Sequence, residues 1–168
     1  MIVMAEPEYG QMKEGQGPSI NYAAKLFVCE ELRRRGVAVS PGPRNDGRIE
    51  LKDRPSLTIR VKARTDAARK GDWVWMAKEK GTLFTDISAK DYTVLVHLDN
   101  DRRAVEYFAV PTVDLNEQLI RAQQDWIRQA GVKGRPHNAN NRMHRFGYNE
   151  DQRQWLREHH QDWSLIVG

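Results

Sequence analysis

The chain has 168 residues, of which 30% are charged and 39% hydrophobic, and its formal net charge is +4 at pH 7. This length suits one domain with a core that needs no cross-links, and the single cysteine excludes an intramolecular disulfide or a multi-cysteine zinc site. No apolar run approaches the roughly 20 residues of a membrane span and the apolar N-terminus is too short for a signal peptide, so we expect a soluble protein of the reducing cytoplasm.

The charge is unevenly distributed. Residues 44–70 hold nine Lys and Arg against four Asp and Glu, and residues 132–148 hold four cations and two histidines with no acid. Residues 1–31, in contrast, hold two Lys and five Glu. Basic stretches in an otherwise balanced chain fit the footprint of a protein that binds a polyanion, and they fit a solvated surface of uneven charge equally well.

The first half of the chain predicts an arm, a helix and several strands. Residues 1–18 carry Pro, Gly and Glu without periodicity, which predicts an irregular N-terminal arm. Ser19 precedes an amphipathic segment that ends in three arginines and Gly36, the pattern of a capped helix. Strands are expected at 37–39, 48–51 and 56–62, and residues 70–78 fit either a strand or an aromatic loop.

The second half predicts a strand pair and two helices. Residues 92–98 are apolar enough for a central strand covered on both faces, and 105–110 return beside it. Asp114 is expected to cap a helix that Gly131 closes. A basic loop at 132–147, a short helix begun by a capping box at Asn149 and a packed tail or last strand at 163–167 complete the chain.

This order of elements predicts an α/β sandwich with a mixed sheet. Residues 19–131 form the expected core. Residues 132–168 form a C-terminal extension of loop, helix and tail that packs on the core, so the whole chain is one domain.

The strands at 48–51 and 56–62 carry the best candidate for a site. Alternation along each strand predicts that Glu50, Arg60 and Lys62 share one face. An acid on one strand and a lysine on the next form the skeleton of a metal-dependent phosphodiesterase, in which the acid binds Mg²⁺ and the lysine stabilises charge or orients water. An ordinary cross-strand ion pair on an exposed sheet face explains Glu50 and Lys62 without any chemistry.

Residues 20–120 resemble the PD-(D/E)xK nuclease superfamily, which has the restriction-endonuclease-like fold. The helix Ala24–Gly36 looks like the family's opening helix, and Arg48–Leu51 looks like the strand that bears the motif acid. Thr58–Lys62 (Thr-Ile-Arg-Val-Lys) looks like the family's Ile-Gln-Val-Lys or Ile-Glu-Val-Lys strand. The strand pair that begins at Asp91 and continues through Glu106 resembles that of prokaryotic members.

The resemblance implies a restriction-endonuclease-like mixed sheet flanked by helices and hydrolysis of DNA with Mg²⁺. Glu50 would hold the metal, and Lys62 would orient the nucleophile or stabilise the charge of the phosphorane. Arg60 or Lys25 would clamp a phosphate. Asp46 competes with Glu50 as the motif acid.

Two positions depart from the family pattern. Lys25 stands where the helix glutamate would be, and Arg60 stands where the Glu or Gln before the lysine would be. One carboxylate is a poor site for Mg²⁺, and two added cations repel a metal and attract a phosphate. Glu31, on the flank of the helix, is the acid expected to replace the missing ligand.

Other residues keep two interpretations. Trp73 and Trp75, near Lys70, Lys78 and Lys80, either stack on bases or pack in the core. The segment 132–147 either contacts phosphates and bases or is a solvated loop. Cys29 is expected to be a buried hydrophobe, and His97 a satisfied core histidine. The residues expected to contact nucleic acid are Lys25, Arg64, Arg135, Arg142 and Arg145.

The sequence therefore predicts a prokaryotic nucleic-acid-processing protein of this nuclease superfamily, with DNA as its partner and no membrane. Mg²⁺ is the expected cofactor if the protein cleaves DNA, and a homodimer is one open arrangement. The alternative is a catalytically silent relative that binds nucleic acid or a protein. A third interpretation is an interaction module whose basic loops bind an acidic protein.

Overall fold

The computed structural model describes residues 19–44, 46–66, 71–77, 83–84, 86–129, 131–138 and 141–167. The arm expected at 1–18 and the lysines at 70, 78 and 80 lie outside the described residues. The elements in chain order are α1 (Ile20–Arg34), β1 (Val39–Ser40), β2 (Arg48–Leu51), β3 (Thr58–Thr65), β4 (Trp73–Met76), β5 (Asp91–Leu98), β6 (Ala104–Pro111), α2 (Thr112–Arg128), the 3₁₀ turn Val132–Gly134, β7 (Met143–Phe146), α3 (Glu150–Arg157) and α4 (Ser164–Val167).

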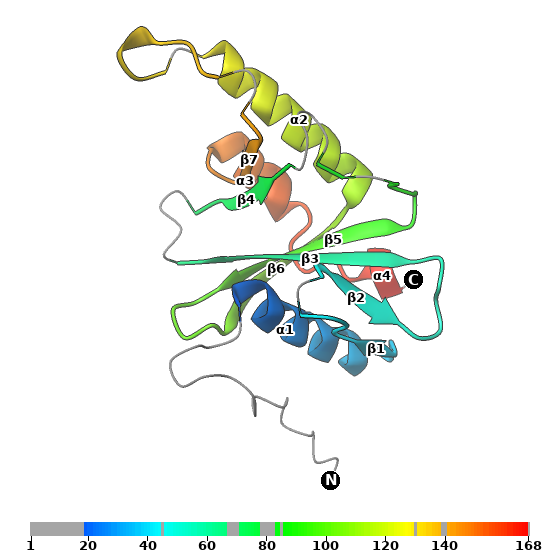
Figure 1. Ribbon diagram of the computed structural model, residues 1–168. Helices are drawn as coiled ribbons and strands as arrows, with labels where there is room; N and C mark the ends of the chain where they lie inside the picture. The colour runs from blue at the N-terminus through cyan, green and yellow to red at the C-terminus, as the bar shows by residue number, and fades with distance from the viewer. Residues whose placement is uncertain are drawn as a thin grey trace.

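A mixed sheet lies in the middle of the molecule, as predicted. Its strand order is β1-β2-β3-β5-β6, and β3 and β5 run parallel whereas the other neighbours are antiparallel. Helices α1 and α4 cover one side of this sheet (Figure 1). The other side is covered by α2, α3 and a second, two-stranded sheet of β4 and β7.

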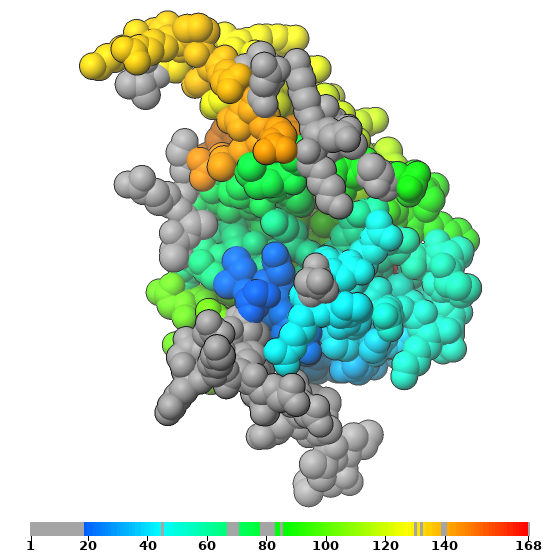
Figure 2. Space-filling model, in the orientation of Figure 1, coloured from blue at the N-terminus to red at the C-terminus, as the bar shows by residue number. Residues whose placement is uncertain are grey.

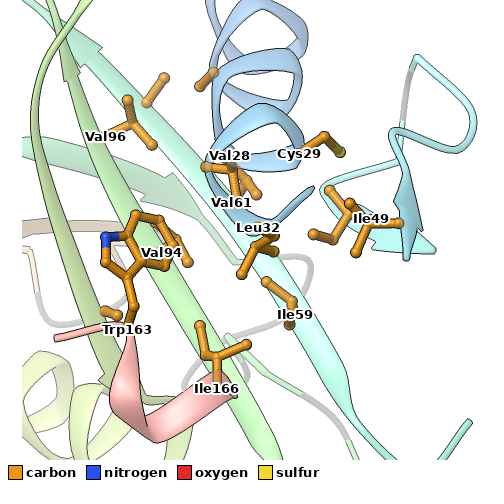
Figure 3. Packing of buried hydrophobic residues seen from close by; sticks show 14 of the residues in the cluster. Val28, Cys29, Leu32, Ile49, Ile59, Val61, Val94, Val96, Trp163 and Ile166 are labelled. Carbon is orange, nitrogen blue, oxygen red and sulfur yellow. The ribbon is translucent and has the colours of Figure 1, made fainter. Parts of the chain in front are cut away.

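The first layer forms because α1 is capped and amphipathic. The backbone N–H of Tyr22 donates to Ser19 Oγ, and Gly36 takes a positive φ of 82° just after the helix, as the sequence predicts. Figure 3 shows Val28, Cys29 and Leu32 packed against residues of the sheet. Cys29 is fully buried, as expected, and its burial raises the thiol pKa to about 11.

The second layer shows whether the two tryptophans of β4 are exposed for stacking or packed in the core. Trp73 and Trp75 are 1% and 9% exposed and pack with residues of β5, β6, α2, β7 and α3, so the core interpretation is confirmed. The indole Nε1 of Trp73 donates to the carbonyl of Val96 at 3.2 Å, which satisfies its polar atom within the core.

The tail and the last helix join the two layers. Ala109 N–H donates to the carbonyl of His159, and Gln161 N–H donates to the carbonyl of Tyr107, so the chain runs along the outer edge of β6 and covers it. The tail then forms α4, which places Trp163 and Ile166 in the core beside α1 (Figure 3). The expectation of a packed tail is confirmed, as a helix rather than a strand.

Several boundaries differ from the prediction. Strand β1 lies at Val39–Ser40 rather than 37–39, and β3 runs over Thr58–Thr65 rather than 56–62. Helix α2 ends at Arg128 with Gln129 as its C-cap, so Gly131 does not close it.

Helix α2 begins at Thr112, with Pro111 as its N-cap, so Asp114 lies in the first turn rather than before it. Asp114 still stabilises this helix end, because a carboxylate there interacts favourably with the helix dipole. The basic loop contains a strand, β7, because His144 and Phe146 are buried against β4 in an antiparallel pair.

Candidate functional site

The strand β3 has two chemically different faces. Its alternate residues Ile59, Val61 and Ala63 are buried in the layer of α1. Its other residues, Arg60, Lys62 and Arg64, each place a cation over an aromatic ring on the opposite side. The rings are Phe84 at 5.3 Å, Trp75 at 5.7 Å and Trp73 at 4.6 Å, respectively. These three cations are called the β3 cation row below.

Arg60 is already neutralised by an acid. Its guanidinium donates to both oxygens of the Asp91 carboxylate, with Nε at 3.0 Å from Oδ1 and Nη2 at 2.9 Å from Oδ2. Asp91 is 2% exposed, and its Oδ1 also accepts a hydrogen bond from Thr112 Oγ1 at 2.6 Å. A bidentate pair of this kind holds β3 against β5, so Arg60 has a structural partner where the sequence predicted a phosphate clamp.

Lys62 has no such partner. Its ammonium lies over the ring of Trp75, and it makes no hydrogen bond or ion pair with any residue that the structure describes. The side chain is half-buried, and this burial lowers the pKa of the ammonium. A cation drawn out of water without a counter-ion is unfavourable until an anion joins it, so Lys62 is the anion-binding candidate of the row.

Arg64 is intermediate between Arg60 and Lys62, because acids lie near it but one of its nitrogens lacks a hydrogen-bond partner. Burial lowers the pKa of its guanidinium, and the nearby carboxylates of Glu106, Asp66 and Asp72 oppose that shift. Its Nε is buried without a hydrogen bond in the described part of the chain. His97, on the neighbouring strand, is partly buried, and its Nε2 lies 2.5 Å from the carboxylate of Asp66. Its Nδ1 is buried without a hydrogen bond in the described residues, so the expected satisfied core histidine is confirmed at one nitrogen only.

Strand register decides which acid lies beside Lys62. Arg48 pairs with Arg60, and Val61 N–H donates to the carbonyl of Gly47 at 2.7 Å, so the residues just before β2 pass beside β3 near Val61. The same register places Glu50 opposite Thr58, about 13 Å along the strand from Lys62 at roughly 3.3 Å per residue. Of the two acids that the sequence left open, Asp46 is nearer to Lys62 along the register, but both acids act on the ammonium of Lys25, and burial alone accounts for the lowered pKa of Lys62.

The side chains of these two acids have local partners. Asp46 Oδ1 accepts from the backbone N–H of Arg48 at 3.0 Å, which shapes the turn that leads into β2. Glu50 Oε2 lies 3.3 Å from the hydroxyl of Ser40 on β1. Glu50 thus belongs to the edge of the sheet and not to the β3 cation row.

Lys25 is fully buried and fixes the loop before β2. Its Nζ donates to the backbone carbonyls of Pro43 and Asp46, both at 2.7 Å. Burial lowers the pKa of this ammonium, and the nearby Asp46, Cys29 and Glu50 oppose the shift. The sequence predicted a phosphate contact for Lys25. The structure corrects this, because the side chain has no exposed surface and two of its donors are already used.

Glu31 lies on another side of α1. Its carboxylate pairs with Arg34 at 3.1 Å and with Arg35 at 3.7 Å, and it lies close enough to Tyr107 on β6 to raise the phenol pKa together with burial, the larger cause. It does not meet Asp46 or Glu50. No group of three or more His, Cys, Asp or Glu side chains among the described residues is arranged to hold a metal.

The residues present therefore do not fit the Mg²⁺ site that the resemblance implies. Asp46 supplies a single carboxylate, and the ammonium of Lys25 donates to the backbone carbonyl of Asp46. Mg²⁺ needs a near-octahedral set of oxygen ligands. Glu31 is paired with arginines of α1, and Asp46 and Glu50 lie near the ammonium of Lys25, which repels a metal cation.

A cavity of about 120 Å³ lies between α2 and strand β7 of the second sheet. It is lined by Ala122, Gln123, Trp126, Asn141, Met143, Arg145 and Tyr148. Of the cations predicted to contact nucleic acid, Arg145 lines this cavity, and Arg135 and Arg142 are exposed on the segment that leads to β7. The sequence did not single out Trp126, Gln123 or Tyr148, because only the pairing of β7 with β4 brings them together.

No family model matches the chain, and no curated protein matches it. None of the helices in the described ranges is long and apolar enough to cross a membrane. The chemistry of the β3 cation row and of the α2–β7 cavity therefore carries the functional argument.

Proposed function

We propose that the protein binds nucleic acid through the β3 cation row, with Lys62 as the central phosphate contact. The observation that carries this proposal is the half-buried Lys62 ammonium, which has an aromatic ring beneath it and no acid beside it in the described residues. A phosphate supplies the missing negative charge and can accept its hydrogen bonds.

An extended polyanion fits better than a single small anion. Arg64 lies two residues along β3, on the same face as Lys62. Both cations belong to the basic stretch at 44–70, where nine Lys and Arg outnumber four Asp and Glu. Affinity for nucleic acid comes largely from several such cations that displace counter-ions together. DNA is the partner that the resemblance to nucleases favours.

The proposal includes a restriction-endonuclease-like fold that binds phosphate directly. The mixed sheet flanked by helices agrees with that fold in its coarse architecture. Lys25 holds a loop by hydrogen bonds where the family would carry a glutamate, and Arg60 is paired with Asp91 where the family would carry a Glu or Gln. These two replacements favour binding over metal-dependent cleavage.

One observation favours cleavage as a second candidate function. Asp46 precedes β2 and lies nearer to Lys62 along the register than Glu50 does, so an acid and a lysine follow the order of the nuclease motif. No step through a metal follows from this single carboxylate. Cleavage is therefore the competing outcome of the experiment.

The test measures affinity for fluorescent duplex and single-stranded DNA and RNA over a range of salt concentrations. We expect Lys62→Ala to weaken binding about tenfold and to reduce the salt slope by about 1, because one phosphate contact is lost. Lys52→Ala is the matched control, since Lys52 is an exposed lysine in the turn between β2 and β3. Equal effects of the two variants would contradict the proposal.

The same preparations are incubated with Mg²⁺ or Mn²⁺ to measure cleavage. The binding proposal expects intact substrate with the wild-type protein and with both variants. Cleavage by wild type that is lost in both Asp46→Asn and Lys62→Ala would establish the second candidate instead.

A further inference from the structure

The α2–β7 cavity lies close to the β3 cation row. Asp72 links the two regions: its carboxylate pairs with Arg145, which lines the cavity, and lies close enough to Arg64 of the row to oppose the lowering of that guanidinium's pKa. We infer that this cavity binds an unpaired base of the nucleic acid whose phosphates contact the row. The inference rests on the proposed function and adds a preference for single strands.

The aromatic and sulfur side chains of the cavity suit a flat ring. Trp126 is stacked against the imidazole of His137, with centroids 3.8 Å apart and planes at 3°. His137 does not line the cavity, so the indole is supported from one side and meets the cavity on another. Tyr148 and Met143 complete the apolar lining, and Met143 is 37% exposed. Stacking on such side chains accepts any base, because every base has a π face.

The polar atoms that remain unused can read the edge of a base. Gln123 Nε2 donates to the carbonyl of Asn141, and Asn141 Oδ1 accepts from the N–H of Met143, both at 3.0 Å. The side chains therefore retain the Gln123 oxygen as an acceptor and the Asn141 amide nitrogen as a donor. An acceptor and a donor on one rim match the mixed edges that unpaired bases present.

A buried acid positions the cation of the cavity. Asp72 is 2% exposed, and its Oδ2 lies 2.8 Å from Nε of Arg145. The contact is an ion pair without hydrogen-bond geometry, since Arg145 Nε and both Asp72 oxygens have no hydrogen-bond partner in the described residues. The two terminal nitrogens make no hydrogen bond to the residues that the structure describes, and the side chain is 39% exposed. Arg145 is thus held in place with donors left for a base edge or the phosphate that follows it.

The volume of the α2–β7 cavity and the charge of the residues around it indicate which ligand fits. The cavity volume of about 120 Å³ is below the roughly 300–1,000 Å³ of sites that enclose a whole small molecule. It therefore accommodates a ring and leaves sugar and phosphate outside. The segment 132–148 beside it carries four cations and no acid, which complements a phosphate backbone. Figure 2 shows the end of α2 and β7, in yellow and orange, together at one end of the molecule.

The test compares the affinity of the full chain for three ligands of equal length: a single-stranded oligonucleotide, the same strand in a duplex, and an abasic strand that keeps only sugar and phosphate. We expect the single strand to bind roughly five- to hundredfold more tightly than the abasic strand, the range of stacking on aromatic side chains. Met143→Ala and Tyr148→Ala should each reduce that ratio.

Met76→Ala is the matched control. Met76 is the cross-strand partner of Met143, is 61% exposed and does not line the cavity, so its removal should leave the ratio unchanged. Circular dichroism verifies that each variant is folded, and either Met143→Ala or Tyr148→Ala is sufficient for the test.

The outcomes separate this inference from the proposed function. Equal affinity for the single and the abasic strand, still weakened by Lys62→Ala, would overturn the base site and leave the phosphate row intact. A base preference that Met143→Ala and Tyr148→Ala do not change would also overturn the site. A preference lost in these variants, together with an affinity for both strands that Lys62→Ala does not weaken, would support the cavity and contradict the row.

Discussion

Each side of the central sheet holds a lysine that is at least half-buried, and the two lysines differ in the acceptors that their ammonium groups contact. On the side of α1, the ammonium of Lys25 donates to two backbone carbonyls at 2.7 Å. On the side of β4, the ammonium of Lys62 lies over the ring of Trp75 and has no hydrogen-bond or ion-pair partner in the part of the chain that the structure describes. Burial lowers the pKa of both groups. The comparison shows that burial alone does not indicate function, because a cation whose acceptors belong to the protein is structural, whereas one without acceptors can bind a ligand.

Arg60 and Lys62 show the same distinction within one strand, because only Arg60 has an acid partner among the described residues. Removing that partner, Asp91, is the strongest test. We expect Asp91→Ala to lower the free energy of unfolding by about 3–5 kcal/mol, because it leaves the mostly buried guanidinium of Arg60 without a counter-ion. Urea denaturation measures this loss. Asp125→Ala removes the acid of an exposed pair with Arg128 and should cost less than about 1 kcal/mol. Similar losses in the two variants would show that Arg60 is not held by Asp91.

The two lysines should separate stability from binding. Lys25→Met is expected to lower the free energy of unfolding by about 2–4 kcal/mol, because a fully buried side chain loses two hydrogen bonds to backbone carbonyls of the loop before β2. Lys62→Met should change it by less than about 1 kcal/mol, since no hydrogen bond to a described residue is lost. The second variant should lose nucleic-acid affinity instead. The distinction fails if Lys62→Met unfolds the protein as readily as Lys25→Met does.

The burial of His144 predicts a smaller effect, which is a dependence of the folding stability on pH. Its ring is 4% exposed, neither nitrogen has a hydrogen-bond partner in the described residues, and burial lowers its pKa. Above the unfolded pKa of about 6.5 the ring is neutral in both states and has no effect on the pH dependence. Below it, the unfolded state binds a proton that the folded state resists, so stability falls as pH decreases, by at most about 1.4 kcal/mol per pH unit.

Thermal unfolding between neutral and mildly acidic pH measures this slope. His144→Met should flatten it, because the group that titrates on unfolding is gone. His160→Gln is the control, since His160 is exposed, and it should retain the wild-type slope. An unchanged slope in His144→Met would assign the pH dependence to other groups.

Local patterns predicted the elements whose signals lie within one segment. The cap at Ser19, the glycine at position 36 and the alternation of β2 and β3 were recognised because each depends on neighbouring residues. Strand β7 was missed because its partner β4 lies about 70 residues earlier in the chain, and a short polar segment carries no sign of such pairing. Alternation also predicted that Lys62 and Arg60 share a face.

The sequence by itself determined a mixed α/β fold, a buried Cys29 and a row of cations along one strand, since periodicity and capping are local properties. The tertiary structure decided which cation of the row has no acid partner among the described residues. Pairing brought Asp91 to Arg60, buried Lys25 beneath the loop before β2, and placed Lys62 over the ring of Trp75. The physical reason is that the partner of a charge depends on contacts between segments far apart in the chain, and no local pattern encodes them.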